Sequence, residues 1–350
     1  MFLTEDELCT LQKKFSLSLK DFEFPGEDEF LSFLDESITS LENENASYRP
    51  KNFEEKCGGL LDFSLDQKPV IVVPDLHGRT DFLIELLNFN LENFLGEKIT
   101  VLSALNKSLI KLVCVGDGVH AESRAVERWH KAFEDYLNGI FDGEAMREEM
   151  KENISTMLIV MELKNLFTEN FHFLKGNHEN VLNENSHGNF SFRKFVLEGS
   201  MCCKFLQHFY GDAVLHLISI WEKSLPLFAL FKNFCISHAE PAKVFTREQI
   251  INAAKYDEIV SGLTWTANGD VTSNTCWETF RKLAGKKNAE SQKENFFYLG
   301  GHRPVKENYD LRQNGTYVQI HNPNKKNAVF CVPGKKFNPE TDIFCVSSGE

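Results

Sequence analysis

The chain has 350 residues, of which 42% are hydrophobic and 25% charged, as in an ordinary folded globular protein. Its formal charge of −13 excludes a bulk attraction to nucleic acid or to an anionic membrane, although it leaves room for a local basic pocket. No apolar stretch approaches the length that crosses a bilayer, so we expect no membrane partner.

The cysteines indicate a reducing compartment. There are nine of them, an odd number, and no C-x-x-C pair occurs. This pattern argues against a disulfide scaffold or a zinc ribbon in a chain of this length. Residues 1–15 lack the basic start and the apolar run of a signal peptide. We therefore expect reduced thiols and a cytoplasmic location.

Residues 1–66 are predicted to form a helical N-terminal segment. The sequence Thr4 to Glu7 is typical of a capped helix start. Apolar residues at helical spacing follow from Leu8 to Leu19 and again from Phe30 to Leu41. Nothing in this segment indicates chemistry, so the catalytic domain is expected to occupy residues 67–350.

From residue 69 onward, short apolar runs alternate with helical patterns. Strands are predicted at 69–73, 109–115, 171–174, 227–236 and 296–299, with a final pair at 317–321 and 328–332. Helices are predicted at 79–89, 123–140, 145–166, 192–210 and 214–223. The alternation indicates a layered α/β fold, in which functional groups gather beyond the carboxyl ends of the strands. The helices around 120–168 are interpreted as an insertion.

Five of the predicted strands are followed by groups suited to metal or phosphate chemistry. They are Asp75-x-His77, Gly116-Asp117-Gly118, Gly176-Asn177-His178-Glu179, Ser237-His238 and Gly300-Gly301-His302. Each alone is explained by a turn or a structural histidine, but their coincidence at five strand ends is improbable. The other histidines show no such placement: His120, His130, His172, His187, His208, His216 and His321.

The residue types match a centre of two divalent ions. Two cations held about 3.5–4 Å apart need a shared anion, and Asp117 is the expected bridge. Mixed carboxylate, amide and imidazole ligands favour Mn, Fe or Zn. Six residues are expected to hold the ions: Asp75 and His77 on one, Asn177, His238 and His302 on the other, with Asp117 between them.

This centre predicts hydrolysis of a phosphate monoester by in-line attack of a hydroxide shared between the ions. The leaving alkoxide needs a proton. His178 follows a ligand directly and is not needed as one, so it is the candidate general acid. A cation should hold the phosphate oxygens, for which Arg124 is the first candidate and Arg281 the second.

These motifs resemble the calcineurin-like metallophosphoesterases, and within them the phosphoprotein phosphatase branch. The stretch Asp75–Leu83 is similar to D-x-H-G-x-x-x-D-L, and Leu263-Thr264-Trp265 is similar to L-L-W. Gly116-Asp117 and Gly176–Glu179 match two further blocks, and the resemblance spans about residues 69–335. It implies a layered β-sheet sandwich flanked by helices, two metal ions, and a phosphorylated substrate such as a phosphoserine or phosphothreonine protein.

The second block departs from the family pattern. The family has G-D-x-x-D-R-G, whereas this sequence has G-D-G-V-H-A-E-S-R-A. His120 stands where the family has an Asp that orients the catalytic His, and Ala121 where it has an Arg that binds phosphate. Glu122 and Arg124 are the candidates to take over these two roles.

Two other functions stay open. Related enzymes hydrolyse nucleotides such as dinucleoside polyphosphates, so a nucleotide is an alternative substrate. A catalytically silent binding protein with the same fold is the alternative of another class, and the changes at His120 and Ala121 motivate it. Retention of all six expected ligands together with His178 favours an enzyme.

Overall fold

Two β-sheets form the centre of the molecule, which is a computed structural model that describes residues 2–271 and 274–346. The six-stranded sheet has the order β1 (Leu60–Phe63), β5 (Phe228–Phe231), β6 (Phe234–Ser237), β7 (Phe297–Gly300), β9 (Tyr317–Gln319) and β8 (Asp310–Arg312). The five-stranded sheet has the order β11 (Ile343–Cys345), β10 (Asn327–Cys331), β2 (Val70–Val73), β3 (Lys111–Cys114) and β4 (Phe171–Phe173). Both sheets are mixed, with β2, β3 and β4 parallel to one another.

Alternate residues of the strands serve two different cores, because successive side chains of a strand point to opposite faces. Val70 and Val72 of β2 belong to an inner core shared by the two sheets, whereas Ile71 and Val73 pack under helices. In the other sheet, Leu299 of β7 lies in the same inner core and its neighbour Tyr298 packs under a second set of helices. The result is a four-layer arrangement of helices, sheet, sheet and helices, which confirms the predicted α/β sandwich.

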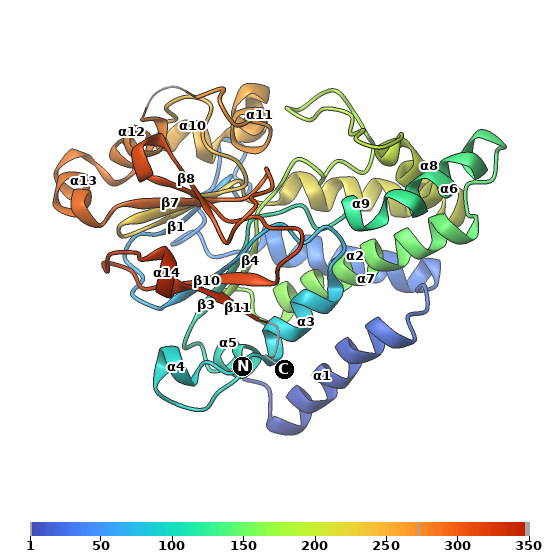
Figure 1. Ribbon diagram of the computed structural model, residues 1–350, viewed down its shortest axis with the longest axis horizontal. Helices are drawn as coiled ribbons and strands as arrows, with labels where there is room; N and C mark the ends of the chain where they lie inside the picture. Colours follow the sequence, from blue (N-terminus) through green and yellow to red (C-terminus); the bar gives the residue numbers. More distant parts are fainter. Residues whose placement is uncertain (1, 272–273, 347–350) are drawn as a thin grey trace.

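Most helices cover the five-stranded sheet and its surroundings (Figure 1). They are α1 (Glu5–Lys20), α2 (Glu27–Glu42), α3 (Thr80–Asn88), α4 (Glu92–Leu95), α5 (Val101–Asn106), α6 (Val126–Leu137), α7 (Glu144–Leu166), α8 (Glu198–Tyr210) and α9 (Asp212–Ser224). The six-stranded sheet is covered by α10 (Arg247–Ile251), α11 (Asp257–Thr264), α12 (Thr275–Ala284) and α13 (Lys286–Gln292), and α14 (Pro339–Asp342) lies beside β10 and β11.

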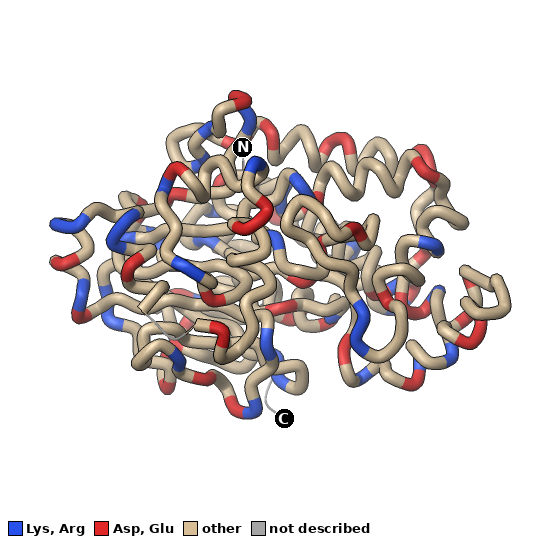
Figure 2. Tube along the Cα trace, turned by 90° about the horizontal axis from the view of Figure 1, so that it is seen from above, with Lys and Arg blue, Asp and Glu red and all other residues tan. Residues whose placement is uncertain are grey.

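Short 3₁₀ turns complete the described elements: η1 (Ser123–Ala125), η2 (Ala253–Lys255), η3 (Lys293–Asn295) and η4 (Gln313–Gly315). None of the helices in the described ranges is long and apolar enough to cross a bilayer. Basic and acidic residues are interspersed along the trace (Figure 2).

The N-terminal segment contains the two predicted helices and also a strand that was not expected. The α1 helix begins with a capping box, in which Thr4 and Glu7 satisfy each other's backbone N–H groups. Its buried Leu11 and Phe15 join the same core as α3 and α7. Residues 60–63 form β1, which pairs in parallel with β5. The division of the chain at residues 66 and 67 stays a prediction.

A buried ionic cluster ties this segment to the five-stranded sheet. The Glu44 carboxylate pairs with Arg49 and Lys164, and one of its oxygens lies 3.3 Å from Nδ1 of His172 in β4. All four side chains are almost fully buried. We call Glu44, Arg49, Lys164 and His172 the Glu44 cluster.

Two strand predictions were wrong in detail. The apolar run 227–236 forms the hairpin β5–β6 and not one strand, because the turn at 232–233 is anchored by the Asn233 side chain, whose amide donates to two backbone carbonyls. The runs 317–321 and 328–332 do not pair, since β9 and β10 lie in different sheets. Both errors arise where strands are buried on both faces, so that hydrophobicity alone reveals neither turns nor partners.

Candidate metal centre

The carboxyl ends of strands from both sheets meet at one place, and polar side chains follow each of them. From the five-stranded sheet come residues after β2, β3 and β4, and from the six-stranded sheet residues after β6, β7 and β9. These side chains are buried, except that of His302, which is partly buried. The convergent residues are Asp75, His77, Asp117, Asn177, His178, His238, His302 and His321.

Two glycines let the backbone come close to the carboxylates. A Cβ atom on Gly301 would overlap the Asp75 carboxylate, and one on Gly176 would overlap the Asp117 carboxylate. Any other residue at these positions would displace an expected ligand. The glycines that precede Asn177 and His302 in the sequence are therefore explained by the packing of the centre itself.

Three of the expected ligands have left-handed backbone conformations, which are rare outside glycine. The φ angles are 47° for His77, 52° for Asp117 and 65° for His302. Such conformations cost of the order of 1–3 kcal/mol each and cluster at functional sites. Their occurrence at three ends of the central strands supports a functional role for this place.

The second half of the centre is built around Asn177. Its Oδ1 lies 2.9 Å from Nε2 of His238 and 2.8 Å from Nδ1 of His302. The other ring nitrogen of His238, Nδ1, donates to the Val115 carbonyl at 3.0 Å, so Nε2 of the neutral ring carries a lone pair. When the ring is protonated, Nε2 donates to Oδ1 of Asn177; when it is neutral, the lone pair of Nε2 faces Oδ1, an arrangement that a cation would stabilise.

The first half is built around His77. Its Nδ1 donates to the His120 carbonyl at 3.1 Å, which leaves Nε2 free to face the carboxylates. Nε2 lies 3.9 Å from Oδ2 of Asp75 and 3.7 Å from Oδ2 of Asp117. The same Asp117 oxygen lies 3.3 Å from Nε2 of His238 in the second half. One carboxylate oxygen is thus shared by the two halves, as expected for a bridge.

The charges and unpaired atoms of the centre fit divalent cations. Burial opposes protonation of His238, yet the carboxylates of Asp117 and Asp75 raise its pKa to about 9. Oδ1 of Asp75 and Nε2 of His302 are buried and have no hydrogen-bond partner among the described residues. Unpaired buried polar atoms are costly, and these two lie where a bound cation could satisfy them. The donor set is one that binds transition metals.

His178 lies beside the shared carboxylate. Its backbone N–H donates to Oδ1 of Asp117 at 2.9 Å, and its Nε2 is 3.7 Å from Oδ2. Its Nδ1 is 2.9 Å from Nδ1 of His120, and its ring lies 3.8 Å from that of Phe192. The neighbour that orients His178 is therefore His120 and not Glu122.

Glu179 holds the loops of the centre together. Its carboxylate accepts hydrogen bonds from the backbone N–H groups of Asp117 at 2.9 Å, Gly118 at 2.8 Å and Gly176 at 2.6 Å. These bonds join the loop after β3 to the loop after β4. The sequence motif contains this residue, but its positioning role becomes evident only from the contacts.

The two arginines expected to bind phosphate lie elsewhere. Arg124 pairs with Glu152 of α7 at 2.6 Å and donates to the His77 carbonyl at 3.0 Å. It lines a cavity of about 570 Å³ between α7 and the loop at 323–326, outside the cavity of the centre. Arg281 lies on α12, where it pairs with Glu278.

The centre opens into its own cavity of about 190 Å³. His77, Asn177, His178 and His302 lie in its wall, and Phe192 and Trp265 flank it. Three cations line the same cavity, namely Arg193, Lys194 and Arg303. The sequence does not reveal Arg193 and Lys194, because neither follows a strand end. Arg303 does follow one, but the sequence pattern there points to its neighbour His302.

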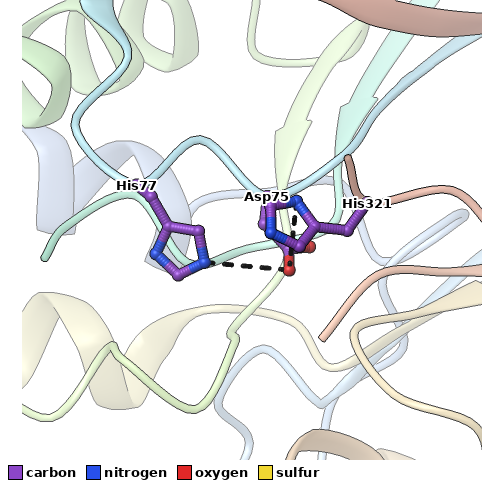
Figure 3. Close-up of side chains that lie close together, drawn as sticks. All are labelled: Asp75, His77 and His321. Carbon is purple, nitrogen blue, oxygen red and sulfur yellow. Dashed lines mark ion pairs between the residues drawn. The ribbon is translucent and has the colours of Figure 1, made fainter. Parts of the chain in front are cut away.

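His321 is the second omission. Its ring faces the same Asp75 oxygen as His77 does, with Nδ1 3.7 Å from Oδ2 of Asp75 (Figure 3). The sequence did carry a signal, because the predicted strand 317–321 ends on this residue. At the end of an apolar run, however, a histidine resembles an ordinary core residue, so the sequence alone gives His321 no role.

The two-sheet sandwich, its flanking helices and the strand-end cluster together define a calcineurin-like phosphoesterase fold. Among solved structures, the chain is similar to a protein serine/threonine phosphatase from Saccharomyces cerevisiae with similarity to human phosphatase PP5. The two share 14% identity over 97% of this chain and 96% of the other, with a TM-score of 0.59. At this identity the likeness establishes the fold, and it confirms at that level the resemblance indicated by the motifs.

Weaker likenesses exist to two other structures. A cold-active protein-tyrosine phosphatase of a psychrophilic Shewanella species shares 13% identity over 77% of this chain and 76% of that chain, with a TM-score of 0.42. A candidate diadenosine tetraphosphatase shares 16% identity over 80% of this chain and 99% of that chain, with a TM-score of 0.40. No protein-family model and no curated protein sequence matches the chain.

Proposed function

We propose that the protein is a phosphoesterase with a dinuclear metal centre that hydrolyses phosphate monoesters. The observation that carries the proposal is the pair of ligand groups that share one oxygen of Asp117. One group contains Asp75 and His77, and the other contains Asn177, His238 and His302. Of these residues, His77, Asn177 and His302 lie in the wall of a cavity lined by cations, which supports a phosphorylated substrate.

The ions, when bound, would polarise the phosphate and lower the pKa of a water molecule so that it can act as the nucleophile. The chain's own residues have separate tasks. His178 can give a proton to the leaving oxygen from Nε2, because its Nδ1 is held by His120. Arg303 and Arg193 can hold the phosphate oxygens by charge-assisted hydrogen bonds. Ionised Asp117 keeps His178 in place through the backbone bond at 2.9 Å.

We further propose a phosphoserine or phosphothreonine protein as the substrate, in a reducing compartment such as the cytoplasm. The fold likeness to a serine/threonine phosphatase supports the substrate class. All nine cysteines are free thiols, which supports the compartment. Trp265 lies at the rim of the cavity, within the segment that resembles the family's L-L-W.

The test is hydrolysis of para-nitrophenyl phosphate by metal-stripped protein to which Mn, Fe, Zn, Mg or Ca is added in turn. Activity restored by a transition metal and lost in Asp117→Asn is the expected result. The expected loss is on the order of 10³-fold or more, because a shared charge of the centre is removed. Asp310→Asn, on an exposed residue of β8, is the matched control.

Two outcomes would contradict the proposal. Full activity of Asp117→Asn would exclude the bridging role. Absence of activity with every metal, in protein shown to bind two ions, would exclude the phosphomonoesterase. In the second case nucleotides would be screened next, and a protein inactive on them as well would be a binding protein.

A further inference from the structure

One ring in the centre has an arrangement that the expected ligand set does not explain. His321 follows β9 and is fully buried, and its two ring nitrogens face different partners. Nε2 lies 2.8 Å from Oε2 of Glu122, whereas Nδ1 lies 3.7 Å from Oδ2 of Asp75. Figure 3 shows ion-pair lines from both His77 and His321 to the Asp75 carboxylate.

The hydrogen bond to Glu122 fixes the tautomer of His321. A carboxylate can only accept, so in the neutral ring the proton is on Nε2 and Nδ1 carries the lone pair that a metal ion needs. Nδ1 is buried and has no hydrogen-bond partner in the described part of the chain. The Asp75 oxygen that lies 3.7 Å away belongs to a carboxylate, which has no proton to offer. The structure therefore aims an unshared electron pair at an anionic oxygen.

The distances fit a common cation. Ligands about 2.0–2.2 Å from one ion stand no more than about 4.4 Å apart. Oδ2 of Asp75 is 3.7 Å from Nδ1 of His321 and 3.9 Å from Nε2 of His77, and one donor atom from each of the three lies within 4.8 Å of the others. Each histidine donates the N–H of its other ring nitrogen to a fixed oxygen, which is the usual arrangement around a metal-bound imidazole.

Resting on the dinuclear centre proposed above, we infer that His321 binds the ion of Asp75 and His77 through Nδ1, and that Glu122 orients it. Glu122 is itself anchored by Lys194 at 3.0 Å, a cation on the rim of the cavity. The first ion then has four protein ligands, namely Asp75, His77, Asp117 and His321. Two of them are imidazoles, a set that favours Zn, Fe or Mn over Mg or Ca.

The inference also gives Glu122 a task different from the one expected from the sequence. It does not contact His178, whose partner is His120. Glu122 lies in the loop after β3, and it joins that loop to His321, which follows β9 of the six-stranded sheet. Glu122 is thus a positioning residue for a metal ligand.

The test measures metal binding directly, without turnover. Metal-stripped wild-type protein and His321→Ala are titrated with Zn, bound metal is counted by elemental analysis, and affinity is obtained by competition with a chelator. Wild type should bind two ions. His321→Ala should keep the second ion and bind the first at least about 100-fold more weakly, since loss of a ligand costs more than the 10–100-fold typical of its orienting partner. His216→Ala, on the exposed face of α9, is the control.

Glu122 provides a second, independent readout. Glu122→Ala should lower the affinity for the first ion by about 10–100-fold. Glu122→Gln should recover much of that loss, because an amide oxygen still accepts from Nε2 of His321. If His321→Ala fails to fold, as judged by circular dichroism, these two variants decide. Unchanged affinity in Glu122→Ala would then overturn the inference.

The failures of the two proposals are distinguishable. Wild-type protein that binds no divalent ion would overturn the dinuclear centre and this inference with it. Wild type that binds two ions, together with folded His321→Ala that binds both with unchanged affinity, would overturn the inference alone. An equal loss of affinity for both ions in His321→Ala would also overturn the inference, since such a loss would indicate a general structural effect.

Discussion

The molecule buries charged groups in two places, and the two are built differently. In the Glu44 cluster every polar side-chain atom has a partner within the described residues. Arg49 donates to Glu44 and to three backbone carbonyls, and Lys164 donates to Glu44 and to the carbonyls of Thr168 and Phe171. In the metal centre, Asp75, His302 and His321 each keep a buried atom without a partner among those residues.

The difference separates a structural cluster from a functional one. Although burial favours the neutral acid, the charges of Lys164 and Arg49 hold the pKa of Glu44 well below its usual range. The cluster is therefore complete without any ligand. The candidate metal centre keeps unpaired acceptor atoms, which a bound cation would satisfy. Buried charge alone does not indicate function, whereas unpaired polar atoms that converge from several strand ends favour a ligand site.

The largest expected effect on stability concerns the complete cluster. Glu44→Gln should lower the free energy of unfolding by about 3–5 kcal/mol, because two buried cations lose their counter-charge. Metal content and kcat should stay unchanged in the folded protein. Urea denaturation measures the first quantity, and exposed Glu42→Gln is the matched control. If Glu44→Gln lost metal but kept its stability, the Glu44 cluster would be functional and not structural.

His178 tests the boundary between ligand and catalyst inside the incomplete cluster. His178→Ala should keep both ions and lower kcat by about 10²–10⁴-fold, which is the usual contribution of a general acid. The loss should be larger for alkyl phosphates than for para-nitrophenyl phosphate, because the poorer leaving group needs the proton more. Kinetics with both substrates and a metal count provide the answer. A variant that has lost an ion would make His178 a ligand.

Arg303 tests whether the cavity binds phosphate through its exposed cations. Its guanidinium has no hydrogen-bond partner in the described ranges, although its carbonyl is fixed by the Gln319 amide. Arg303→Ala should weaken inhibition by free phosphate by about 1.5–3 kcal/mol, or on the order of 10- to 100-fold. Lys306→Ala, exposed in the same loop, should leave the inhibition constant unchanged. Equal inhibition constants of phosphate in the two variants would show that Arg303 does not bind phosphate.

The smallest effect is expected at Arg124, which belongs with the satisfied groups. Its ion pair with Glu152 is partly exposed, so Arg124→Ala should cost no more than about 1 kcal/mol of stability. The inhibition constant of phosphate should change less than in Arg303→Ala, because Arg124 lines another cavity. A larger change than in Arg303→Ala would restore Arg124 as the phosphate-binding residue.

The sequence predicted the strand-end residues well, for a physical reason. Asp75, Asp117 and Asn177 follow short β-branched or aromatic runs and are flanked by glycines, so both the strand and its end are visible locally. Parallel strands bring such ends together, which made a joint interpretation possible. Only the general α/β pattern was needed for this step.

The remaining parts depend on contacts that no local pattern encodes. His321 ends a run that is buried on both faces, where a histidine looks like any core residue. The orienting role of Glu122 depends on a loop that brings residues 199 positions apart into contact. Likewise, Arg193 and Lys194 reach the cavity through an irregular loop after β4, whose path the sequence does not indicate.

The candidate ligands come from both sheets, so bound ions would have a mechanical role. Asp75 and His302 are 227 positions apart in the chain and already joined by a hydrogen bond of 2.8 Å. An ion held by Asn177 from the five-stranded sheet and His302 from the six-stranded sheet, which are 125 positions apart, would join one layer of the sandwich to the other and close a long loop. Such a link restricts the unfolded chain, as a disulfide does. The cysteines of this protein are all free thiols, so bound ions would provide cross-links of the kind that secreted proteins obtain from disulfides. A chelator would then remove these cross-links, as a reductant removes a disulfide.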